Sequence, residues 1–458
     1  METKEVFPKL EFFDLFRELS LHFGSNEVCI LDSAKGPDAD RNCSIVGIFP
    51  KFDLTIRKGK VKIECKCEKL ESQLSKLNLE SPVFSDIFPQ LQEIFQTGGL
   101  IGYFGYEYLH YLNNIKRENI ADLNMPDVHL CFYSHLLIKN TKDNSVKLQS
   151  HFICDDAEEE KQKILKFISE KREVNREKRE EVKAGKIENS MSKEEFLEKT
   201  KIALDYIAKG EIQQIILGNR KKVKTNAKAI DIYSEIRKEN PSPYMFFWER
   251  ADYSLIGNSP ELQLKVEGQH AEIRPIGGTS KGKGRNATER QKLLDDMISS
   301  KKEQTEHIML VDLAKDDIGV YAEKGSVKVD KFMFVEEYSN VFHLVSVVSG
   351  KLPKNCNSMK VFEASFPAGT LTGAPRVRAC EIIQELEDYE RGVYGGAFGF
   401  FDFNGDILSS IAIRTAIKIG DNVYFQSSAG IVASSNPEDE WNETEFKTNA
   451  IKSVIERV

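Results

Sequence analysis

The sequence predicts an α+β fold built from antiparallel sheets. Strand-like runs and long helical segments are both present, but they do not alternate strictly along the chain, as they would in a doubly wound parallel sheet. The first third is rich in strand-like segments. At 458 residues, the chain is long enough for two to four domains or one very large one.

Apolar and polar residues alternate in several N-terminal stretches. Lys51 to Ile63 and Val128 to Ile138 are expected to be strands with one polar face. Gly98 to Tyr103 is expected to be a strand that enters a tight turn.

A highly charged segment follows, from Asp155 to Lys186. It is dense in Glu, Lys and Arg and contains no proline, so a solvated helix or helical linker is expected. These shifts divide the chain into a strand-rich region (1–155), a linker (156–188) and a second region (189–458).

The second region begins with a helix signal. Ser192 fits an N-cap, Glu195 completes a capping box, and Phe196, Ala203 and Ile207 continue one helical face. Further strands are expected at Gln213–Leu217, Tyr244–Trp248, Ser254–Gly257, Gly396–Phe403, Ser410–Lys418 and Asn422–Ser427, and helices near Glu289–Leu313 and Asp439–Val458.

Composition excludes several functional classes. The net charge of −8 argues against a nucleic-acid surface, which needs a basic face. No apolar run approaches the roughly 18 residues that a membrane span requires. The charged start, Met1 to Val6, does not resemble a secretory signal, so a cytoplasmic location is expected.

The eight cysteines are scattered, and only Cys65 and Cys67 are close together. A single Cys-x-Cys pair is a poor zinc signal, so the cysteines are expected to be reduced thiols. None is closely flanked by glycine on both sides, as the nucleophile of a glutaminase would be. The chain is therefore not expected to hydrolyse glutamine.

Two helical segments each carry a pair of glutamates three residues apart, Glu303 with Glu306 and Glu440 with Glu443. Residues at this spacing share a helical face. Such pairs are most often solvated surface. If the four carboxylates converged, they would need a cation, and oxygen ligands of this kind suit Mg²⁺.

Glycines stand beside hydroxyl residues in four C-terminal clusters, Gly277–Thr279, Ala368–Pro375, Tyr394–Gly396 and Ser428–Gly430. Backbone amides at glycine turns can bind the oxygens of a carboxylate or phosphate. Arg414 lies in an otherwise apolar predicted strand, where an inward arginine needs an anionic partner. Together these features favour a small dianionic substrate.

A series of motifs in residues 190–458 resembles the chorismate-utilising enzymes, and most closely the large subunits (component I) of anthranilate synthases. The motifs are Ser259-Pro260-Glu261, Arg274 to Thr279, Glu306-His307 leading into Val311 to Ala314, Glu337-Tyr338-Ser339, His343 to Ser346, Phe366 to Pro375, Tyr394-Gly395-Gly396, Ile413-Arg414-Thr415, and Ala429 to Val432 followed by Glu440 and Glu443. The N-terminal third matches more loosely, through Leu31 to Ser33 and Gly99 to Tyr106.

The resemblance implies a large two-sheet antiparallel sandwich with helices outside, acting on Mg²⁺-bound chorismate. It implies three catalytic residues: Glu261 as the general acid, His343 for the aromatisation step, and Thr279. Metal binding would fall to Glu306 and Glu443, with Glu303 and Glu440 as further ligands or water-holders. The implied substrate-binding residues are Tyr394, Arg414, Thr370, Ser428, Ala429, Gly430 and Gln214.

Two positions bear on the choice of reaction. Family members that add water carry a lysine base where this chain has Gln214, and an amide has no accessible basic form. Members that make aminodeoxychorismate often carry a nucleophilic lysine where this chain has Gly277, and anthranilate synthases usually have alanine there. The expected product is anthranilate, with aminodeoxychorismate as the alternative; arrest at the aminated intermediate and a catalytically inactive subunit are less favoured.

The resemblance also implies partners. Ammonia would come from a glutamine amidotransferase subunit, so a hetero-oligomer is expected. Tryptophan feedback in the family uses two elements that correspond here to Leu31-Asp32-Ser33 and Asn240 to Met245. The expected regulatory residues are Leu31, Ser33, Pro241, Tyr244 and Met245.

Overall fold

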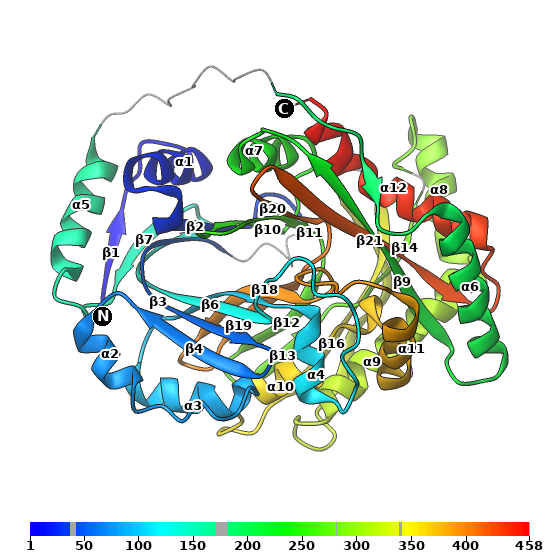
Figure 1. Cartoon of the computed structure of the whole chain (residues 1–458), viewed down its shortest axis with the longest axis horizontal. Helices are drawn as coiled ribbons and strands as arrows, with labels where there is room; N and C mark the ends of the chain where they lie inside the picture. The colour runs from blue at the N-terminus through cyan, green and yellow to red at the C-terminus, as the bar shows by residue number, and fades with distance from the viewer. Residues whose placement is uncertain (37–42, 171–181, 281, 339–340, 458) are drawn as a thin grey trace.

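The computed structural model of the chain describes residues 1–36, 43–170, 182–280, 282–338 and 341–457 (Figure 1). Residues 171–181 of the predicted linker and Ser339 of the Glu337–Ser339 motif lie outside the described residues.

The structure contains strands throughout its length. In the N-terminal part they are β1 (Glu2–Val6), β2 (Val28–Asp32), β3 (Cys43–Arg57), β4 (Lys60–Cys65), β5 (Gly99–Phe104), β6 (Val128–Asn140) and β7 (Val146–Ser150). In the remainder they are β8 (Glu188–Asn189), β9 (Gln214–Lys224), β10 (Tyr244–Glu249), β11 (Ser254–Ser259), β12 (Leu262–Glu267), β13 (His270–Ile273), β14 (Ile276–Thr279), β15 (Lys328–Glu337), β16 (Phe342–Lys351), β17 (Gly373–Ala374), β18 (Ala397–Asp402), β19 (Ile407–Ile411), β20 (Thr415–Ile419) and β21 (Asn422–Val432).

Helices separate groups of these strands. The α-helices are α1 (Phe12–Phe23), α2 (Glu68–Leu74), α3 (Phe84–Ile94), α4 (Leu109–Leu112), α5 (Ala157–Ser169), α6 (Lys193–Ala208), α7 (Ala229–Glu239), α8 (Ala287–Ser299), α9 (Lys301–Gly319), α10 (Ser358–Ala364), α11 (Arg376–Leu386) and α12 (Pro437–Ile455). Short 3₁₀ turns are η1 (Ser25–Glu27), η2 (Tyr106–Tyr108) and η3 (Gly369–Leu371).

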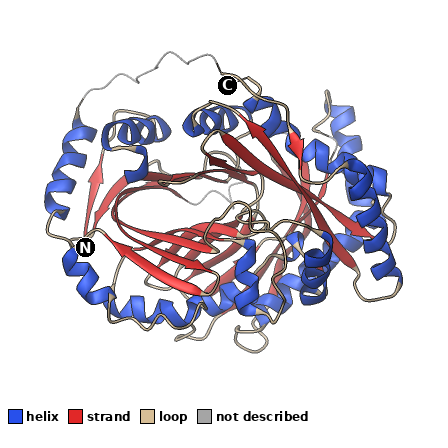
Figure 2. Ribbon diagram, in the orientation of Figure 1, coloured by secondary structure: helices blue, strands red, loops and turns tan. Residues whose placement is uncertain are grey.

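The strands form two curved layers that face each other, with helices on the outer sides (Figure 2). Pairings between the named strands of the described chain run antiparallel and join both layers into one hydrogen-bonded network. The predicted α+β class and antiparallel two-layer architecture are confirmed. The long β9–β21 pair crosses the right side of Figure 1 and includes residues predicted to bind substrate, Gln214 and Ser428–Gly430.

Strands of the N-terminal third pair directly with strands of the second region. β2 pairs with β10, and β5 pairs with β18. The aromatic core also mixes the two parts, because the rings of Phe132 and Phe403 lie 6.1 Å apart in a stacked arrangement. The division of the sequence into 1–155, 156–188 and 189–458 stays a prediction. In the structure, hydrogen-bonded strands join the first and last of these regions.

Two expectations for the N-terminal strands need correction. Lys51 to Ile63 is not one strand but a hairpin, in which β3 turns into β4 through Lys58 and Gly59. The predicted polar face of Val128 to Ile138 is wrong, because nearly all of β6 is buried between β3 and β5. Polar residues such as His129 are instead bonded inside the protein, here to Asp53 and Tyr253.

The charged segment is also less solvated than expected. Its first half forms α5, and Ile164, Phe167 and Ile168 pack into the apolar cluster that includes α1 and β2. The charged residues of α5 lie mainly on the other face, which is the ordinary pattern of an amphipathic helix.

The helix predicted near Glu289–Leu313 is two helices. Ser300 ends α8 and caps α9, where its hydroxyl accepts the backbone N–H of Glu303 at 3.3 Å. The N-cap predicted at Ser192 is confirmed, including the capping box with Glu195. None of the described helices combines the length and apolar character needed to cross a membrane.

Candidate active site

Glu261 lies in the turn between β11 and β12, where the sheet brings it against the Gly369–Leu371 turn. Its side chain and Thr370 line one pocket, together with residues of α9 and of the segment Ile273–Pro275. The position of Glu261 is set by its own backbone, since its N–H donates to Ser259 Oγ at 3.2 Å and its carbonyl accepts Ile411 N–H at 3.0 Å.

Burial changes the proton affinity of this carboxyl. Removal from water raises the pKa of Glu261 to about 8. The Thr370 side chain, the Ile276 backbone and the charges of Arg414 and Lys447 act in the opposite direction. Glu261 is therefore protonated near pH 7 and able to give up a proton, as a general acid must.

His343 lies on β16, directly opposite Thr279 of β14. Its Nδ1–H donates to the Gly278 carbonyl at 2.9 Å, and Thr279 Oγ1 lies 3.2 Å from the same nitrogen. Nε2 is buried and has no hydrogen-bond partner among the described residues. Because a carbonyl can only accept, Nδ1 carries the proton and Nε2 presents a lone pair.

Burial, with the nearby charge of Arg414, lowers the pKa of His343 to about 4. The imidazole is consequently neutral at physiological pH. A neutral ring with a fixed tautomer and an unoccupied Nε2 can act as a proton acceptor.

Arg414 does not lie within a strand, as the sequence suggested. The predicted strand Ser410–Lys418 breaks into β19 and β20, and Arg414 sits in the break with a φ of +50°. A non-glycine residue in this region stores backbone strain, which is often found at functional sites. Burial lowers the pKa of the guanidinium, while Glu261 and Tyr338 raise it.

Tyr394 and Ser428 meet on the other side of the site. The Tyr394 hydroxyl lies 2.7 Å from Ser428 Oγ, and burial raises the pKa of Tyr394 to about 12. Ser428, Ala429 and Gly430 lie on β21, opposite Gly218 to Ile216 of β9. The pairing of β21 with β20 ends at Phe425. Among the described strands, Ser428–Gly430 therefore pairs only with β9.

Gln214 begins β9 and is nearly fully buried. A side chain at Gly430 would place its Cβ 3.1 Å from Gln214 Nε2, so the missing side chain leaves room for this amide. The side-chain oxygen of Gln214, Oε1, is buried and has no hydrogen-bond partner among the described residues. The structure thus brings Gln214 to the predicted substrate residues of β21.

The four predicted metal-binding glutamates come from two helices, Glu303 and Glu306 from α9 and Glu440 and Glu443 from α12. Gly278 leaves space for Glu303, since a Cβ there would lie 2.9 Å from Glu303 Oε2. In the described chain, no three histidine, cysteine or acidic side chains converge closely enough to hold a metal ion. The carboxylates have the donor chemistry that Mg²⁺ prefers, but they do not form a preassembled cluster.

Lys447 is a site residue that the sequence analysis missed. Its Nζ lies 2.6 Å from Glu443 Oε1 and donates to the Ser428 carbonyl at 2.9 Å. Its charge also acts on Glu261 and His343. The ammonium places a positive charge beside a predicted metal ligand, and its spacing four residues after Glu443 on one helix was the available signal.

A second pocket collects four of the five predicted regulatory residues. Leu31, Ser33, Tyr244 and Met245 line it, whereas Pro241 does not and Pro243 does. The pocket is also lined by Asp32, which belongs to the first predicted element, and by five residues outside both elements, Cys43, Phe246, Phe398, Leu408 and Ser410.

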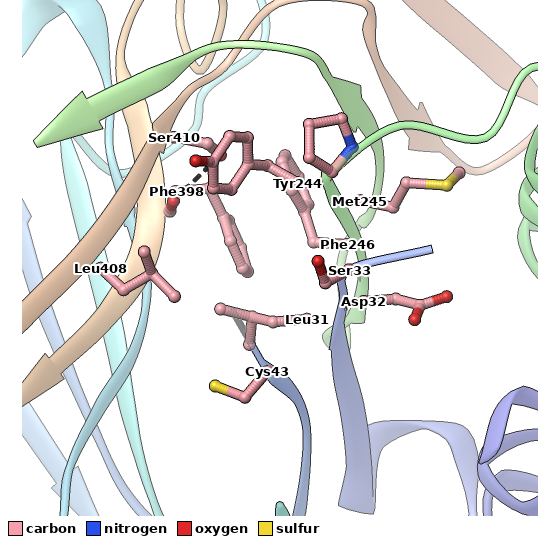
Figure 3. Close-up of a pocket in the computed structure, with 11 residues that line it drawn as sticks. Leu31, Asp32, Ser33, Cys43, Tyr244, Met245, Phe246, Phe398, Leu408 and Ser410 are labelled. Carbon is pink, nitrogen blue, oxygen red and sulfur yellow. Dashed lines mark hydrogen bonds between the residues drawn. The ribbon is translucent and has the colours of Figure 1, made fainter. Parts of the chain in front are cut away.

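The centre of this second pocket is aromatic (Figure 3). The rings of Phe246 and Phe398 stack at 4.0 Å, and Ser33 Oγ is buried without a partner among the described residues. Asp32 and Met245 point away from these rings in the same view. Asp32 is instead bonded to Ser44 and Arg237.

Comparisons with known proteins show which family the chain belongs to. The family described as chorismate binding enzyme matches residues 30–453. Anthranilate synthase component 1 of Aquifex aeolicus (strain VF5) is 37% identical over 368 residues, covering 78% of this chain and 74% of that protein. Aminodeoxychorismate synthase component 1 of Bacillus subtilis (strain 168) is 35% identical over 373 residues, covering 81% of this chain and 78% of that protein.

A solved structure is similar across almost the whole fold. The crystal structure of anthranilate synthase component I from Streptococcus pneumoniae TIGR4 has a TM-score of 0.77 and 29% identity, covering 90% of this chain and 92% of that chain. With the family match spanning residues 30–453 and the relatives at 35% and 37% identity, these findings show that the chain belongs to the chorismate binding enzyme family.

Proposed function

We propose that this chain is the component I of an anthranilate synthase, which adds ammonia to chorismate and eliminates pyruvate to give anthranilate. The similarity to proteins of that name supports the proposal. A protonated Glu261, a neutral His343 and the cations Arg414 and Lys447 supply an acid, a base and a site for a dianion.

The observation that carries the choice of product is the environment of Gly277. This position has no nucleophile, and a Cβ there would lie 2.9 Å from Nδ1 of the fully buried His307. His307 is held in place by Ser346, whose Oγ lies 2.7 Å from Nε2. Because residue 277 is a glycine, it offers no lysine for the covalent route that aminodeoxychorismate-forming members often use.

The proposed chemistry divides between two groups. Glu261 donates its proton to the ring hydroxyl that leaves as water when ammonia adds. His343 Nε2 then accepts the ring C2 proton as the ring C–O bond to the enolpyruvyl group breaks, and the departing enolpyruvyl group takes up a proton to leave as pyruvate, so the ring becomes aromatic. Arg414, Tyr394 and the backbone of Ser428–Gly430 bind the enolpyruvyl carboxylate, with Thr279, Thr370 and Gln214 around the substrate.

Mg²⁺ belongs to the proposal through the donor chemistry of the glutamates. Glu306 and Glu443 would hold it, with Glu303 and Glu440 nearby, and the metal would neutralise substrate carboxylate charge. Lys447 would have to release Glu443, since its ammonium now lies 2.6 Å from that carboxylate.

Aminodeoxychorismate synthesis is the second candidate, favoured by the similarity to the B. subtilis protein. In either case ammonia is proposed to come from a separate glutamine amidotransferase subunit. The described cysteines are free thiols, and burial raises the pKa of several of them, including Cys29 to about 12 and Cys43 to about 11.

The direct test is product identification by mass spectrometry after incubation with chorismate and Mg²⁺. We expect anthranilate with ammonium, no turnover with glutamine, and loss of turnover when a chelator removes the metal. Aminodeoxychorismate as the product would replace the proposal by its alternative. Glutamine-dependent turnover by the pure chain would contradict the need for a partner.

The acid role of Glu261 predicts a pH dependence. The rate of chorismate consumption, expressed per free ammonia, should fall about tenfold per pH unit above a pKa of about 8 as the carboxyl loses its proton. Glu261→Gln should lower turnover by roughly 10² to 10⁴-fold, because the amide cannot donate in this way.

The same group affects stability. Because the folded-state pKa is raised above the ordinary 4.5, the stabilising contribution is fully present below that pH and is lost as the pH rises to about 8. Denaturant unfolding from pH 5 to 8 should show this loss in the wild type but not in Glu261→Gln. Identical pH slopes in the two proteins would contradict a buried, protonated Glu261.

The assignment of His343 predicts a separation of the two steps. His343→Ala should still consume chorismate and accumulate the aminated, non-aromatic intermediate, while anthranilate release falls roughly 10² to 10⁴-fold. Quenched reactions analysed by mass spectrometry measure both species. An equal loss of both steps without an intermediate would show that His343 only supports the structure.

We also propose that the second pocket binds tryptophan as a feedback inhibitor. Its stacked rings suit an indole, and the unpaired Ser33 hydroxyl offers a polar contact. Ser33→Ala should weaken tryptophan inhibition about tenfold, the effect of losing one hydrogen bond, without changing uninhibited turnover. Met245→Thr should have a smaller effect, because Met245 points away from the rings.

Tryptophan titration of initial rates measures both effects. If Ser33→Ala and the wild type have the same inhibition constant, tryptophan does not use this hydroxyl. If the wild type is not inhibited, the pocket has another role.

A further inference from the structure

Arg391 is a fully buried arginine that the proposed reaction does not use. It lies between α11 and β18, is 2% exposed, and forms an ion pair with Glu387, which is 6% exposed. The guanidinium donates from Nε to Glu387 Oε2 at 2.9 Å and from Nη2 to Glu387 Oε1 at 2.5 Å.

The same guanidinium binds the backbone of two other segments. Nη1 donates to the Leu371 carbonyl at 2.7 Å, and Nη2 donates to the Ile216 carbonyl at 2.8 Å. Glu387 extends this connection, because its Oε1 accepts the Gly218 N–H at 2.8 Å. The Arg391 guanidinium therefore donates four hydrogen bonds to acceptors inside the protein.

Each connected segment carries a residue of the candidate active site. Leu371 follows Thr370, which lines the Glu261 pocket, and Ile216 lies two residues after Gln214 on β9. The third segment contains Arg391 itself and Tyr394, whose N–H donates to the Arg391 carbonyl at 3.3 Å. These segments are far apart in sequence, so their relative positions depend on tertiary contacts.

Arg391 is itself held from several sides. Its backbone N–H donates to Glu107 Oε1 at 2.7 Å, and its guanidinium lies 4.4 Å from the Tyr106 ring centroid. The guanidinium also lies close to Gly395, because a side chain at that position would place its Cβ 3.7 Å from Arg391 Nη1. The guanidinium is therefore confined in both position and orientation.

We propose that Arg391 is a positioning residue, which with Glu387 sets the relative placement of Gln214, Thr370 and Tyr394 around the substrate. The inference rests on the proposed function of this site. A planar guanidinium presents donors in a rigid fork, whereas a lysine ammonium presents three donors from one point. Lysine can keep the charge next to Glu387 but cannot reproduce the bonds to both carbonyls.

The test compares Arg391→Lys with Arg250→Lys. Arg250 is partly buried, with 11% of its side chain exposed, and also forms an ion pair with a carboxylate, that of Asp53. It lies at the β10–β11 turn and contacts the Asn26 carbonyl rather than a segment of the candidate active site. Thermal unfolding measures stability, calorimetric titration measures chorismate binding, and steady-state kinetics with saturating ammonium measure kcat and KM per folded molecule.

We expect Arg391→Lys to weaken chorismate binding and to lower kcat/KM by about 100-fold, since small misplacements of binding groups can have effects of this size. Arg250→Lys should leave both within about threefold of the wild type, a small change on the scale of measured transition-state losses. If both variants lose stability but keep wild-type chorismate binding and kcat/KM, the positioning role is overturned.

A second variant separates positioning from charge compensation. Arg391→Met combined with Glu387→Gln removes both buried charges, and the glutamine can still accept the Gly218 N–H. We expect this double variant to be more stable than Arg391→Met alone, because no unpaired charge remains, and still to bind chorismate weakly. Wild-type binding in the stable double variant would overturn the proposal.

The binding measurement also separates this inference from the proposed function. If the wild-type chain binds chorismate but makes no anthranilate, the proposed reaction fails, while the difference between Arg391→Lys and Arg250→Lys still decides the positioning role.

Discussion

The pairing of β5 with β18 builds the layer behind both pockets, since Phe398 of β18 lines the aromatic pocket and β19, the other neighbour of β18, lines both. It joins the N-terminal third to the second region, and Gly102 stands directly opposite Gly399. A Cβ at Gly399 would lie 2.3 Å from the Leu408 carbonyl of β19, so β18 can lie this close to its other neighbour only because this position has no side chain. Through this pairing the early strands become part of the layers that hold the site.

One consequence is that the two pockets share a strand. Ser410 lines the aromatic pocket and the adjacent Ile411 lines the Glu261 pocket, because successive residues of β19 point to opposite faces. Three residues later the chain reaches Arg414 at the break before β20. The candidate regulatory and catalytic centres are therefore neighbours through the backbone of one strand.

Burial determines the chemical state of the site residues. The same loss of water that raises the pKa of Glu261 to about 8 lowers that of His343 to about 4, so both groups are neutral near pH 7. Arg414 and Lys447 are the positive charges that act on both of these groups. The buried charge of Arg391 is instead paired with Glu387, and four hydrogen bonds of its guanidinium go to that carboxylate and to two backbone carbonyls.

The sequence by itself determined the fold class, the family and the capping box at Ser192, because these depend on local spacing and on ordered motifs. Tertiary structure decided the rest. Lys58 and Gly59 divide a predicted strand into a hairpin, and packing on both faces buries the supposed polar side of β6. Lys447 and Arg391 gained their roles through contacts with residues distant in sequence or with backbone carbonyls. Local sequence patterns do not predict such contacts. The same lysine or arginine side chain is solvated or buried depending on which strands and helices surround it in the folded chain.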